Sequence, residues 1–257
     1  MPIVEYLTRD RVAYITLNRP EKKNALDRET VDMLSDTFTR ANEDPEARAV
    51  VLKATGDVFS AGADLGYLQK LQQNTYNENL ADSTSLKELF QKVYTLNKVV
   101  IAQVQGHAIA GGCGLATVCD FIFSQPQAKF GYTEVRIGFV PAIVMVYLLR
   151  RIGEGRARQL LLSGALISAQ TAAEWGLVNT VVPAEELEKE VGAFANKLIG
   201  SNSSQSMQRT KAMIAQVQEM KLDDALAFAA DHNARARGTE DCRRGIKAFL
   251  DKEPIQW

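Results

Sequence analysis

The chain of 257 residues has an apolar content of 46%, a charged content of 24% and a formal net charge of −1. This length suits one large domain or one domain with a small appendage, and it is long enough to bury a core. A near-neutral charge gives no general attraction to nucleic acid or to an anionic membrane, so we expect neither as a partner. No apolar run approaches the ~20 residues that a membrane span needs.

The cysteines and the first ten residues bear on the expected compartment. Cys113, Cys119 and Cys242 have no metal-ligand spacing, and their odd number argues against a disulfide framework. The segment MPIVEYLTRD lacks the basic and apolar blocks of a signal peptide. We therefore expect a cytoplasmic protein with reduced thiols and no bound metal.

In the first half of the chain, short strand-like runs alternate with helical ones. VAYITLN (12–18) and RAVVLKA (48–54) are rich in β-branched residues. Between them, apolar residues recur at helical spacing after a candidate N-cap, Asp27.

The next predicted elements surround a glycine-rich turn. VVIAQVQGHAIA (99–110) predicts one long buried strand, and FIFS (121–124) predicts another. A helix of small residues from Cys113 to Cys119 is expected between them. Alternation of this kind indicates an α/β fold with crossover connections.

Beyond about residue 140 the pattern favours helices. Pro141 is expected to open one helix, Ser168 to cap another, and Pro183 with the acidic residues after it to begin a third. Further helices are predicted over 204–219, 222–236 and 240–251. We therefore divide the chain into an α/β body, 1–195, and a helical C-terminal region, 196–257, that packs on the body or on neighbouring subunits.

Two stretches of small residues can present backbone N–H groups to a ligand. They are GGCG (111–114) and FSAGADL (59–65). N–H groups left free at a strand-to-helix turn are good donors to developing negative charge, and two that converge would form an oxyanion hole. From spacing alone, the simpler interpretation is that both are tight turns in a packed sheet.

An ordered set of motifs resembles a known family. ITLNRPEKKNAL and FSAGADL are followed by VQGHAIAGGCGLATVCDFIFS, AKFGYTEVRIGFVP and SGALISAQTAAEWGLVNTVVP. The set covers essentially the whole chain and resembles the crotonase superfamily of enoyl-CoA hydratases and isomerases. The resemblance implies a crotonase-like spiral of ββα units with a helical C-terminal trimerisation region. It also implies a homotrimer or a dimer of trimers.

The same resemblance implies how the chemistry is divided. The backbone N–H groups of Ala63 and Gly111 would stabilise the enolate of a CoA thioester, and Glu134 would carry the proton. The alternative for Glu134 is a solvated surface residue. Hydratases with two glutamates have the other one just after the glycine run, where this chain has Gly114.

The resemblance further implies an acyl-CoA substrate and no separate cofactor, since coenzyme A is part of the thioester. Lys22 and Lys23 could instead be solvated loop residues, and Asp64 could cap the helix that follows it. The implied CoA-binding residues are Lys22, Lys23, Ala25, Ala61, Asp64 and Leu65, with Phe249 and Lys252 reaching the CoA of an adjacent subunit.

Some residues near these motifs have other expected roles. Tyr132 is expected in the core or in the pocket wall, His107 as a hydrogen-bonded core or loop residue, and Asp120 as an anchor for the strand that follows it. The bulky Ile143, Val144 and Met145 stand where hydratases commonly have glycines. These residues fit helix packing and a reshaped acyl pocket equally well, because cores and pockets use the same apolar side chains.

Three functions follow from these considerations. We expect an enoyl-CoA hydratase-type lyase that hydrates a 2-enoyl-CoA reversibly through an enolate held in an oxyanion hole. The first alternative is a Δ3,Δ2-enoyl-CoA isomerase that uses a single glutamate, which Gly114 favours. The second is a non-catalytic acyl-CoA binding protein, against which the presence of Glu134 argues.

Overall fold

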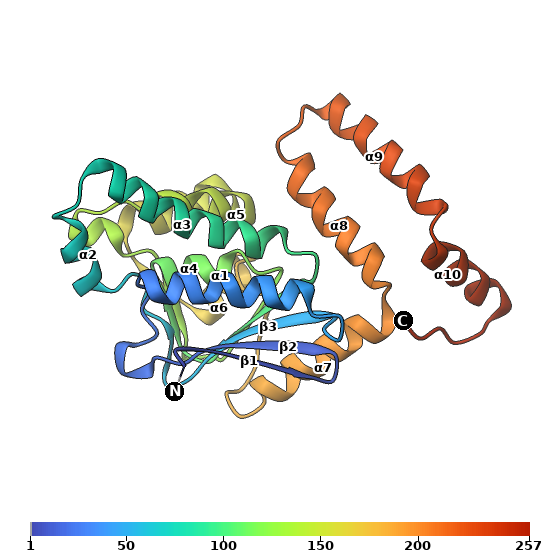
Figure 1. The fold of residues 1–257 in the computed structure, drawn as a ribbon, viewed down its shortest axis with the longest axis horizontal. Coiled ribbons are helices and arrows are strands. Elements are labelled where there is room, and N and C mark those ends of the chain that lie inside the picture. The colour runs from blue at the N-terminus through green and yellow to red at the C-terminus, as the bar shows by residue number, and fades with distance from the viewer. Residues whose placement is uncertain (1) are drawn as a thin grey trace.

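The computed structural model describes residues 2–257, in which three C-terminal helices project from an α/β body (Figure 1). The larger sheet has the strand order β1-β2-β3-β5-β7-β10, and the smaller sheet has the order β4-β6-β8-β9. In the larger sheet β1 runs antiparallel to β2, and every other pair is parallel. The α/β class expected from the sequence is confirmed.

The elements have the following bounds. The strands are β1 (Val4–Arg9), β2 (Val12–Leu17), β3 (Ala49–Ala54), β4 (Val58–Ser60), β5 (Val99–Val104), β6 (His107–Ile109), β7 (Phe121–Ser124), β8 (Lys129–Gly131), β9 (Leu166–Ser168) and β10 (Thr180–Val181). The helices of the body are α1 (Arg28–Glu43), α2 (Leu65–Leu71), α3 (Tyr76–Thr95), α4 (Gly111–Thr117), α5 (Ala142–Ser163), α6 (Ala169–Glu174) and α7 (Leu187–Ser201), with the 3-10 turns η1 (Pro20–Lys22) and η2 (Glu134–Ile137). The projecting helices are α8 (Ser204–Val217), α9 (Leu222–Arg237) and α10 (Glu240–Asp251).

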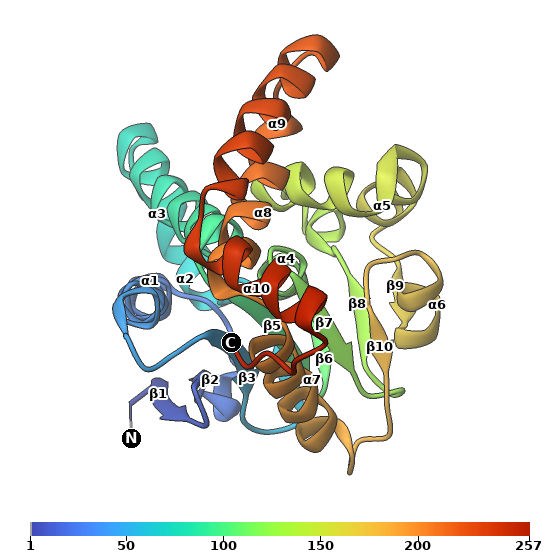
Figure 2. The same cartoon turned by 90° about the vertical axis from the view of Figure 1, so that its right-hand side faces the viewer.

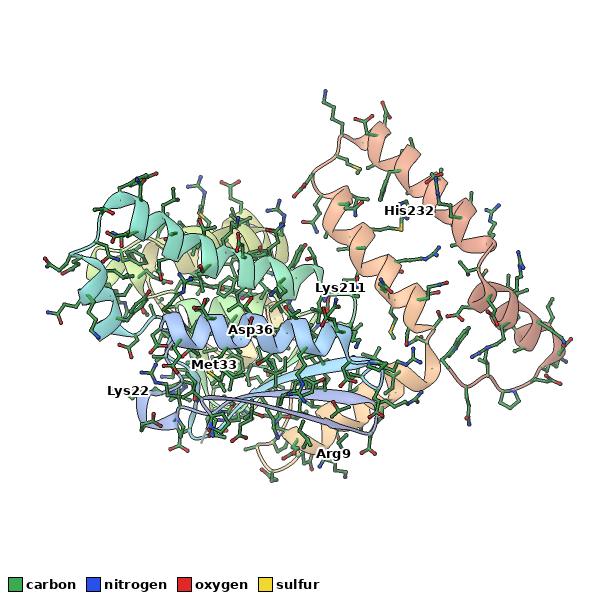
Figure 3. The ribbon with its side chains drawn as sticks, in the orientation of Figure 1. Arg9, Lys22, Met33, Asp36, Lys211 and His232 are labelled. Atoms are coloured by element: carbon green, nitrogen blue, oxygen red, sulfur yellow. The ribbon has the colours of Figure 1, made fainter. Side chains whose placement is uncertain are left out.

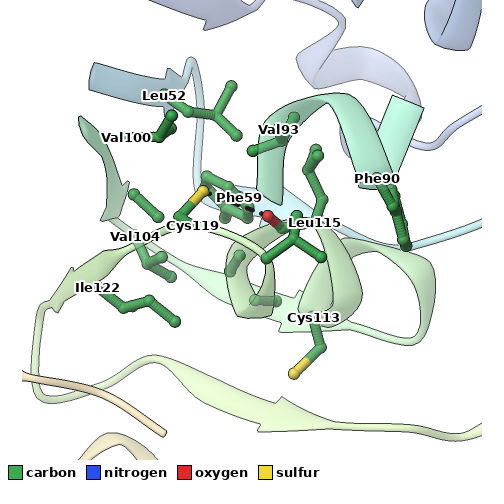
Figure 4. Close-up of a cluster of buried hydrophobic side chains, with 14 of the residues drawn as sticks. Leu52, Phe59, Phe90, Val93, Val100, Val104, Cys113, Leu115, Cys119 and Ile122 are labelled. Atoms are coloured by element: carbon green, nitrogen blue, oxygen red, sulfur yellow. Dashed lines mark hydrogen bonds between the residues drawn. The ribbon is translucent and has the colours of Figure 1, made fainter. Parts of the chain in front are cut away.

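The core lies on both faces of the larger sheet. Strands β2 and β5 are buried along their whole length, as expected for parallel strands covered on both sides. On one face, Leu115 of α4 belongs to the main core cluster, together with Leu52 of β3 and Phe59 of β4 (Figure 4). On the other face α7 packs through a separate apolar cluster, which includes Leu187 and Val191.

Several helix boundaries follow the predicted local signals. The Asp27 carboxylate accepts a hydrogen bond from the Thr30 backbone N–H at 3.0 Å and begins α1. The Ser168 hydroxyl accepts one from the Thr171 N–H at 3.1 Å and begins α6. The helices predicted over 204–219, 222–236 and 240–251 are confirmed as α8, α9 and α10.

The prediction of one long strand over residues 99–110 is wrong. The segment forms β5 in the larger sheet and β6 in the smaller one, and the chain changes sheets at Gly106. A β-carbon on Gly106 would lie only 2.0 Å from the carbonyl oxygen of Asp57. The glycine therefore marks a close approach of two backbones, which an apolar pattern by itself does not reveal.

The C-terminal region extends away from the body (Figure 1), and in Figure 2, which faces that side, α9 reaches beyond the body. Neither α9 nor α10 buries a residue within the described chain, although both carry apolar side chains, such as Leu226 and Phe249. The predicted boundary between residues 195 and 196 falls inside α7, which belongs to the body through its contacts with β3, β5 and β7. Over residues 2–257 no helix is both long and apolar enough to cross a membrane.

Candidate active site

The residues implied in catalysis follow three neighbouring strands of the smaller sheet. Strand β4 pairs parallel with β6, and β6 pairs parallel with β8. Ala63 follows β4, Gly111 begins the helix after β6, and Glu134 begins the turn after β8. Because parallel strands end at the same edge of a sheet, this topology carries all three groups to one edge.

The backbone N–H groups of Ala63 and Gly111 lie close together. A β-carbon built on Gly111 would be 3.9 Å from the Ala63 nitrogen, and one built on Gly62 would be 3.0 Å from the Gly111 nitrogen. Among residues 2–257 neither N–H has an acceptor. Gly111 is the first residue of α4, where a helical N–H has no partner within the helix.

The direction of the Ala63 N–H follows from its pairing with Leu26. The Leu26 N–H donates to the Gly62 carbonyl at 2.7 Å, and the Leu26 carbonyl accepts from the Asp64 N–H at 2.9 Å. Successive amides of an extended chain point to opposite sides, so the Ala63 N–H is directed away from Leu26. The N–H groups of Gly62 and Asp64 are hydrogen-bonded, and the Ala63 N–H between them is left free to donate.

The turn into α4 is held in a strained conformation. Ala110 has φ 52° and ψ −126°, a region that favours glycine and costs a residue with a side chain about 1–3 kcal/mol. Its N–H donates to the Gly131 carbonyl at 2.8 Å, which holds the turn against β8. Gly62 lacks a side chain where a β-carbon would be only 2.8 Å from that of Ala110. Strain of this kind is typical of functional turns.

Glu134 is a buried carboxyl group rather than a surface one. The residue is 9% exposed, so the alternative of a solvated surface glutamate is wrong. Its Oε2 has no hydrogen-bond partner among the described residues. Burial raises the pKa of the Glu134 carboxyl, because the charged form loses hydration. A carboxyl with a raised pKa is suited to accepting and returning a proton near neutral pH.

The place of a second glutamate is closed by the neighbouring helix. Gly114 lies in α4, and a β-carbon there would be 2.2 Å from Cγ1 of Val144 and 3.0 Å from the ring of Phe90. Val144 is buried, so the packing interpretation holds for it, whereas Met145 is 40% exposed. A side chain at residue 114 would therefore require Val144 or α5 to shift.

Most of the residues implied in CoA binding lie on two segments bonded to each other. The Ala61 N–H donates to the Lys23 carbonyl at 3.0 Å, beside the Leu26 contacts described above. Lys22 and Lys23 are exposed at the edge of the body, where Figure 3 labels Lys22. Leu65, the first residue of α2, is also exposed. Ala25 is buried.

Asp64 caps the helix that follows it, one of the two roles that the sequence indicates. Its carboxylate accepts from the Tyr67 N–H at 3.0 Å and begins α2. It also lies 3.5 Å from Arg19, whose guanidinium is 2.6 Å from Asp27. Arg19 therefore joins the two segments. Sequence reasoning missed this role because Arg19 lies in the first motif and its partner Asp64 lies in another, so only the folded chain shows the contact.

Phe249 and Lys252 are far from these segments within one chain. Both lie at the end of α10, and Figure 1 shows α10 and α2 at opposite ends of the molecule. Phe249 is 85% exposed, and Lys252 has a left-handed φ of 57°. The structure does not bring them together with Lys22 or Leu65.

Arg151 is a second residue that the sequence did not reveal. Its guanidinium donates to the carbonyls of Thr117 at 3.1 Å and Cys119 at 2.6 Å, at the C-terminal end of α4. A cation there complements the helix dipole and fixes the helix that begins with Gly111. The side chain comes from α5, so only the tertiary contact of α4 with α5 shows the role.

The structure changes the expected role of Asp120 and specifies that of His107. Asp120 accepts a hydrogen bond from the Val100 N–H of β5 at 2.7 Å, so it anchors that strand rather than the one after it. His107 is exposed, and its Nδ1 accepts from the Lys129 N–H at 3.2 Å. In the described part of the chain, no three His, Cys, Asp or Glu side chains are grouped to hold a metal ion.

Comparison with known proteins identifies the family. The sequence model described as enoyl-CoA hydratase/isomerase matches residues 8–257. A protein of Thermus thermophilus named "Putative enoyl-CoA hydratase" is 42% identical over 95% of this chain and 96% of its own length. Crotonyl-CoA hydratase of Syntrophomonas wolfei is 35% identical over 95% of this chain and 93% of its own length.

A solved structure agrees with these sequence matches. The enoyl-CoA hydratase of Mycobacterium smegmatis superposes with a TM-score of 0.93 and 29% identity, covering 100% of this chain and 99% of that one. Together with the smaller sheet and the paired amides at its edge, these matches show that the chain belongs to the enoyl-CoA hydratase/isomerase family of enzymes.

Proposed function

We propose that this protein is an enoyl-CoA hydratase-type lyase, which adds water reversibly across the 2,3-double bond of an acyl-CoA thioester. The observation that carries the proposal is the pair of free N–H groups of Ala63 and Gly111, at the same sheet edge as the buried Glu134. The names of the relatives from Thermus and Syntrophomonas support hydration over isomerisation.

The proposed reaction uses the amides and the carboxyl in turn. The thioester oxygen accepts hydrogen bonds from Ala63 and Gly111 while water attacks C3 and gives a proton to Glu134. The resulting enolate then takes that proton at C2, which regenerates the carboxylate. Removing one oxyanion donor costs about 2.7–4 kcal/mol in other enzymes, and an acid–base group contributes about 10²–10⁴-fold.

A single carboxyl has a stereochemical consequence. Because Val144 closes the space beside Gly114, Glu134 both activates water and protonates C2 in this proposal. Both events then occur on the face of the substrate that Glu134 approaches. The hydroxyl and the new hydrogen are therefore added to the same face of the double bond.

The proposed substrate contacts extend to a neighbouring subunit. Lys22 and Lys23 are placed as point charges for CoA phosphates, and the segment from Ala61 to Leu65 borders the thioester. We propose a homotrimer or a dimer of trimers in which Phe249 and Lys252 of one chain reach the CoA of the next. The exposed apolar side chains of α9 and α10 support this, since such patches mark interaction surfaces; they are Leu222, Leu226, Ile246, Phe249 and Leu250.

The isomerase is the second candidate, and the Gly114–Val144 packing favours it. Incubation with crotonyl-CoA in one tube and with 3-hexenoyl-CoA in another, followed by product analysis, separates the possibilities. We expect 3-hydroxybutyryl-CoA from the first tube. Formation of 2-hexenoyl-CoA without hydration would support the isomerase, and binding without turnover would support the non-catalytic protein.

A matched pair of variants tests the role of Glu134. We expect Glu134→Gln to lower kcat by about 10²–10⁴-fold with little change in affinity for acetyl-CoA, because an acid–base group is lost and no CoA contact is. Glu185→Gln alters an exposed glutamate outside the site and should leave kcat unchanged. Equal turnover by the two variants would remove Glu134 from the mechanism.

A further inference from the structure

Tyr132 is a fully buried residue that joins β8 to α4. Its ring lies in the main core, and its hydroxyl is 2.9 Å from the Thr117 hydroxyl. The Thr117 hydroxyl donates to the Cys113 carbonyl at 2.7 Å. Since a hydroxyl has one proton to donate, Thr117 accepts from Tyr132. The direction of the hydrogen bonds is therefore from Tyr132 to Thr117 to the backbone of α4.

The surroundings keep the Tyr132 hydroxyl protonated. Burial raises the pKa of Tyr132 well above its usual value, so the residue remains a neutral donor. In Figure 4 the Cys113 thiol points away from Leu115 and Cys119. The side chains of Tyr132, Thr117 and Cys113 are all buried. The hydrogen bond between Tyr132 and Thr117 therefore lies in a region of low dielectric, where water does not compete with it.

This contact lies between the two parts of the proposed site. Tyr132 shortly precedes Glu134, whereas Cys113 and Thr117 lie on the helix whose first residue is Gly111. The bond from the Ala110 N–H to the Gly131 carbonyl also joins the segments. The backbone bond fixes the ends of the strands, and the side-chain bond fixes the helix relative to the turn that holds Glu134.

We propose that Tyr132 and Thr117 are positioning residues, and that their hydrogen bond, the Tyr132–Thr117 link, sets where the Glu134 carboxyl lies relative to the Gly111 N–H. The proposal rests on the proposed function, in which these two groups act on one substrate. Neither Tyr132 nor Thr117 has to touch the thioester. Their effect is on geometry, and a displacement of about 1 Å can cost about 10²-fold in rate.

The test removes the hydroxyls while keeping the shapes. Tyr132→Phe retains the ring, and Thr117 keeps its bond to Cys113, so no donor is left unpaired. Thr117→Val retains the volume, and Thr117→Ser restores the hydroxyl as a matched control. We expect kcat with crotonyl-CoA to fall between about tenfold and a hundredfold in the first two variants, with KM unchanged. Thr117→Ser should return kcat to near the level of the unsubstituted protein.

Repeating the Tyr132→Phe substitution in the Glu134→Gln variant separates a positioning role from a general effect on the fold. In Glu134→Gln the carboxyl to be positioned is absent, so adding Tyr132→Phe should lower the residual kcat no further. An equal loss in both backgrounds overturns the proposal, as does a kcat that neither Tyr132→Phe nor Thr117→Val changes. Absence of turnover by the unsubstituted protein instead overturns the proposed function, and the positioning role with it.

Discussion

Gly114 of α4 and Val144 of α5 form a size-matched contact, in which a β-carbon on the glycine would lie 2.2 Å from Cγ1 of the valine. Real side-chain carbons do not approach so closely, so the glycine is required for the helices to pack as they do. The same contact removes the place from which a second carboxyl would act. Packing and the proposed chemistry are thus linked at one pair of residues.

The first prediction concerns this pair. Gly114→Ala should destabilise the protein, because overpacking a core typically costs about 1–3 kcal/mol. The gain in helix propensity from alanine, roughly 1 kcal/mol, only partly offsets it. Adding Val144→Ala should recover part of the lost stability, since it removes the methyl group at 2.2 Å and leaves the contacts at 3.0 Å with the Val144 β-carbon and the Phe90 ring. Urea unfolding of the single and double variants measures the effect, and a Gly114→Ala protein as stable as its parent would contradict the contact.

The second prediction concerns the pH dependence of catalysis. Glu134 must be ionised to take a proton from water, and burial raises the pKa of its carboxyl. The acid limb of the kcat/KM profile should therefore have its midpoint above the ordinary glutamate pKa of about 4.3. Crotonyl-CoA hydration measured across the acid range gives the midpoint. A limb at or below the ordinary value would show that Glu134 is better hydrated than its burial indicates.

The third prediction concerns the stability cost of the same carboxyl. Its folded pKa lies above the unfolded one, so the native state binds more protons, and stability falls as pH rises through that interval. Glu134→Gln has no charge to bury and should raise the melting temperature at pH 7.5. The gain should shrink as pH falls to below about 4, where both the folded and the unfolded state of the parent become protonated. A constant difference between the two proteins at every pH would point to a cause other than ionisation.

The fourth prediction concerns the attachment of α8 to the body. The Lys211 ammonium lies 2.6 Å from the Asp120 carboxylate and also donates to the carbonyls of Val93 and Lys98, and Figure 3 shows Lys211 where α8 meets the body. Removing one partner of a buried pair costs about 3–5 kcal/mol. We expect Lys211→Met to lower the free energy of unfolding by an amount near the lower end of that range, since the Asp120 side chain is 24% exposed.

A surface pair provides the control for this prediction. Arg158 and Glu154 are in contact on α5 with both side chains largely exposed, so Arg158→Ala should cost about 1 kcal/mol or less. Hydrogen exchange should also show faster opening of α8 in Lys211→Met. Similar denaturation midpoints for the two variants would mean that the Lys211–Asp120 pair does not hold the helix.

Much of the local structure was predictable because its causes lie within a few residues. The caps at Asp27 and Ser168 bond amides in their own first turns, and the C-terminal helices follow apolar spacing along the chain. The motif set also predicted the family, since five motifs in the same order are far more specific than one. The segments carrying Ala63, Gly111 and Glu134 were therefore located before their arrangement was known.

The arrangement itself depended on contacts between distant segments. An apolar run cannot show that residues 99–110 divide between two sheets at Gly106, because the deciding atom is the Asp57 carbonyl on another strand. Closure beside Gly114 likewise comes from α4 and α5 packing together. The amino-acid sequence by itself determined which residues offer amides and a carboxyl. Only the tertiary structure decided which of them share one sheet edge, because proximity arises from strand pairing and helix packing across the whole chain.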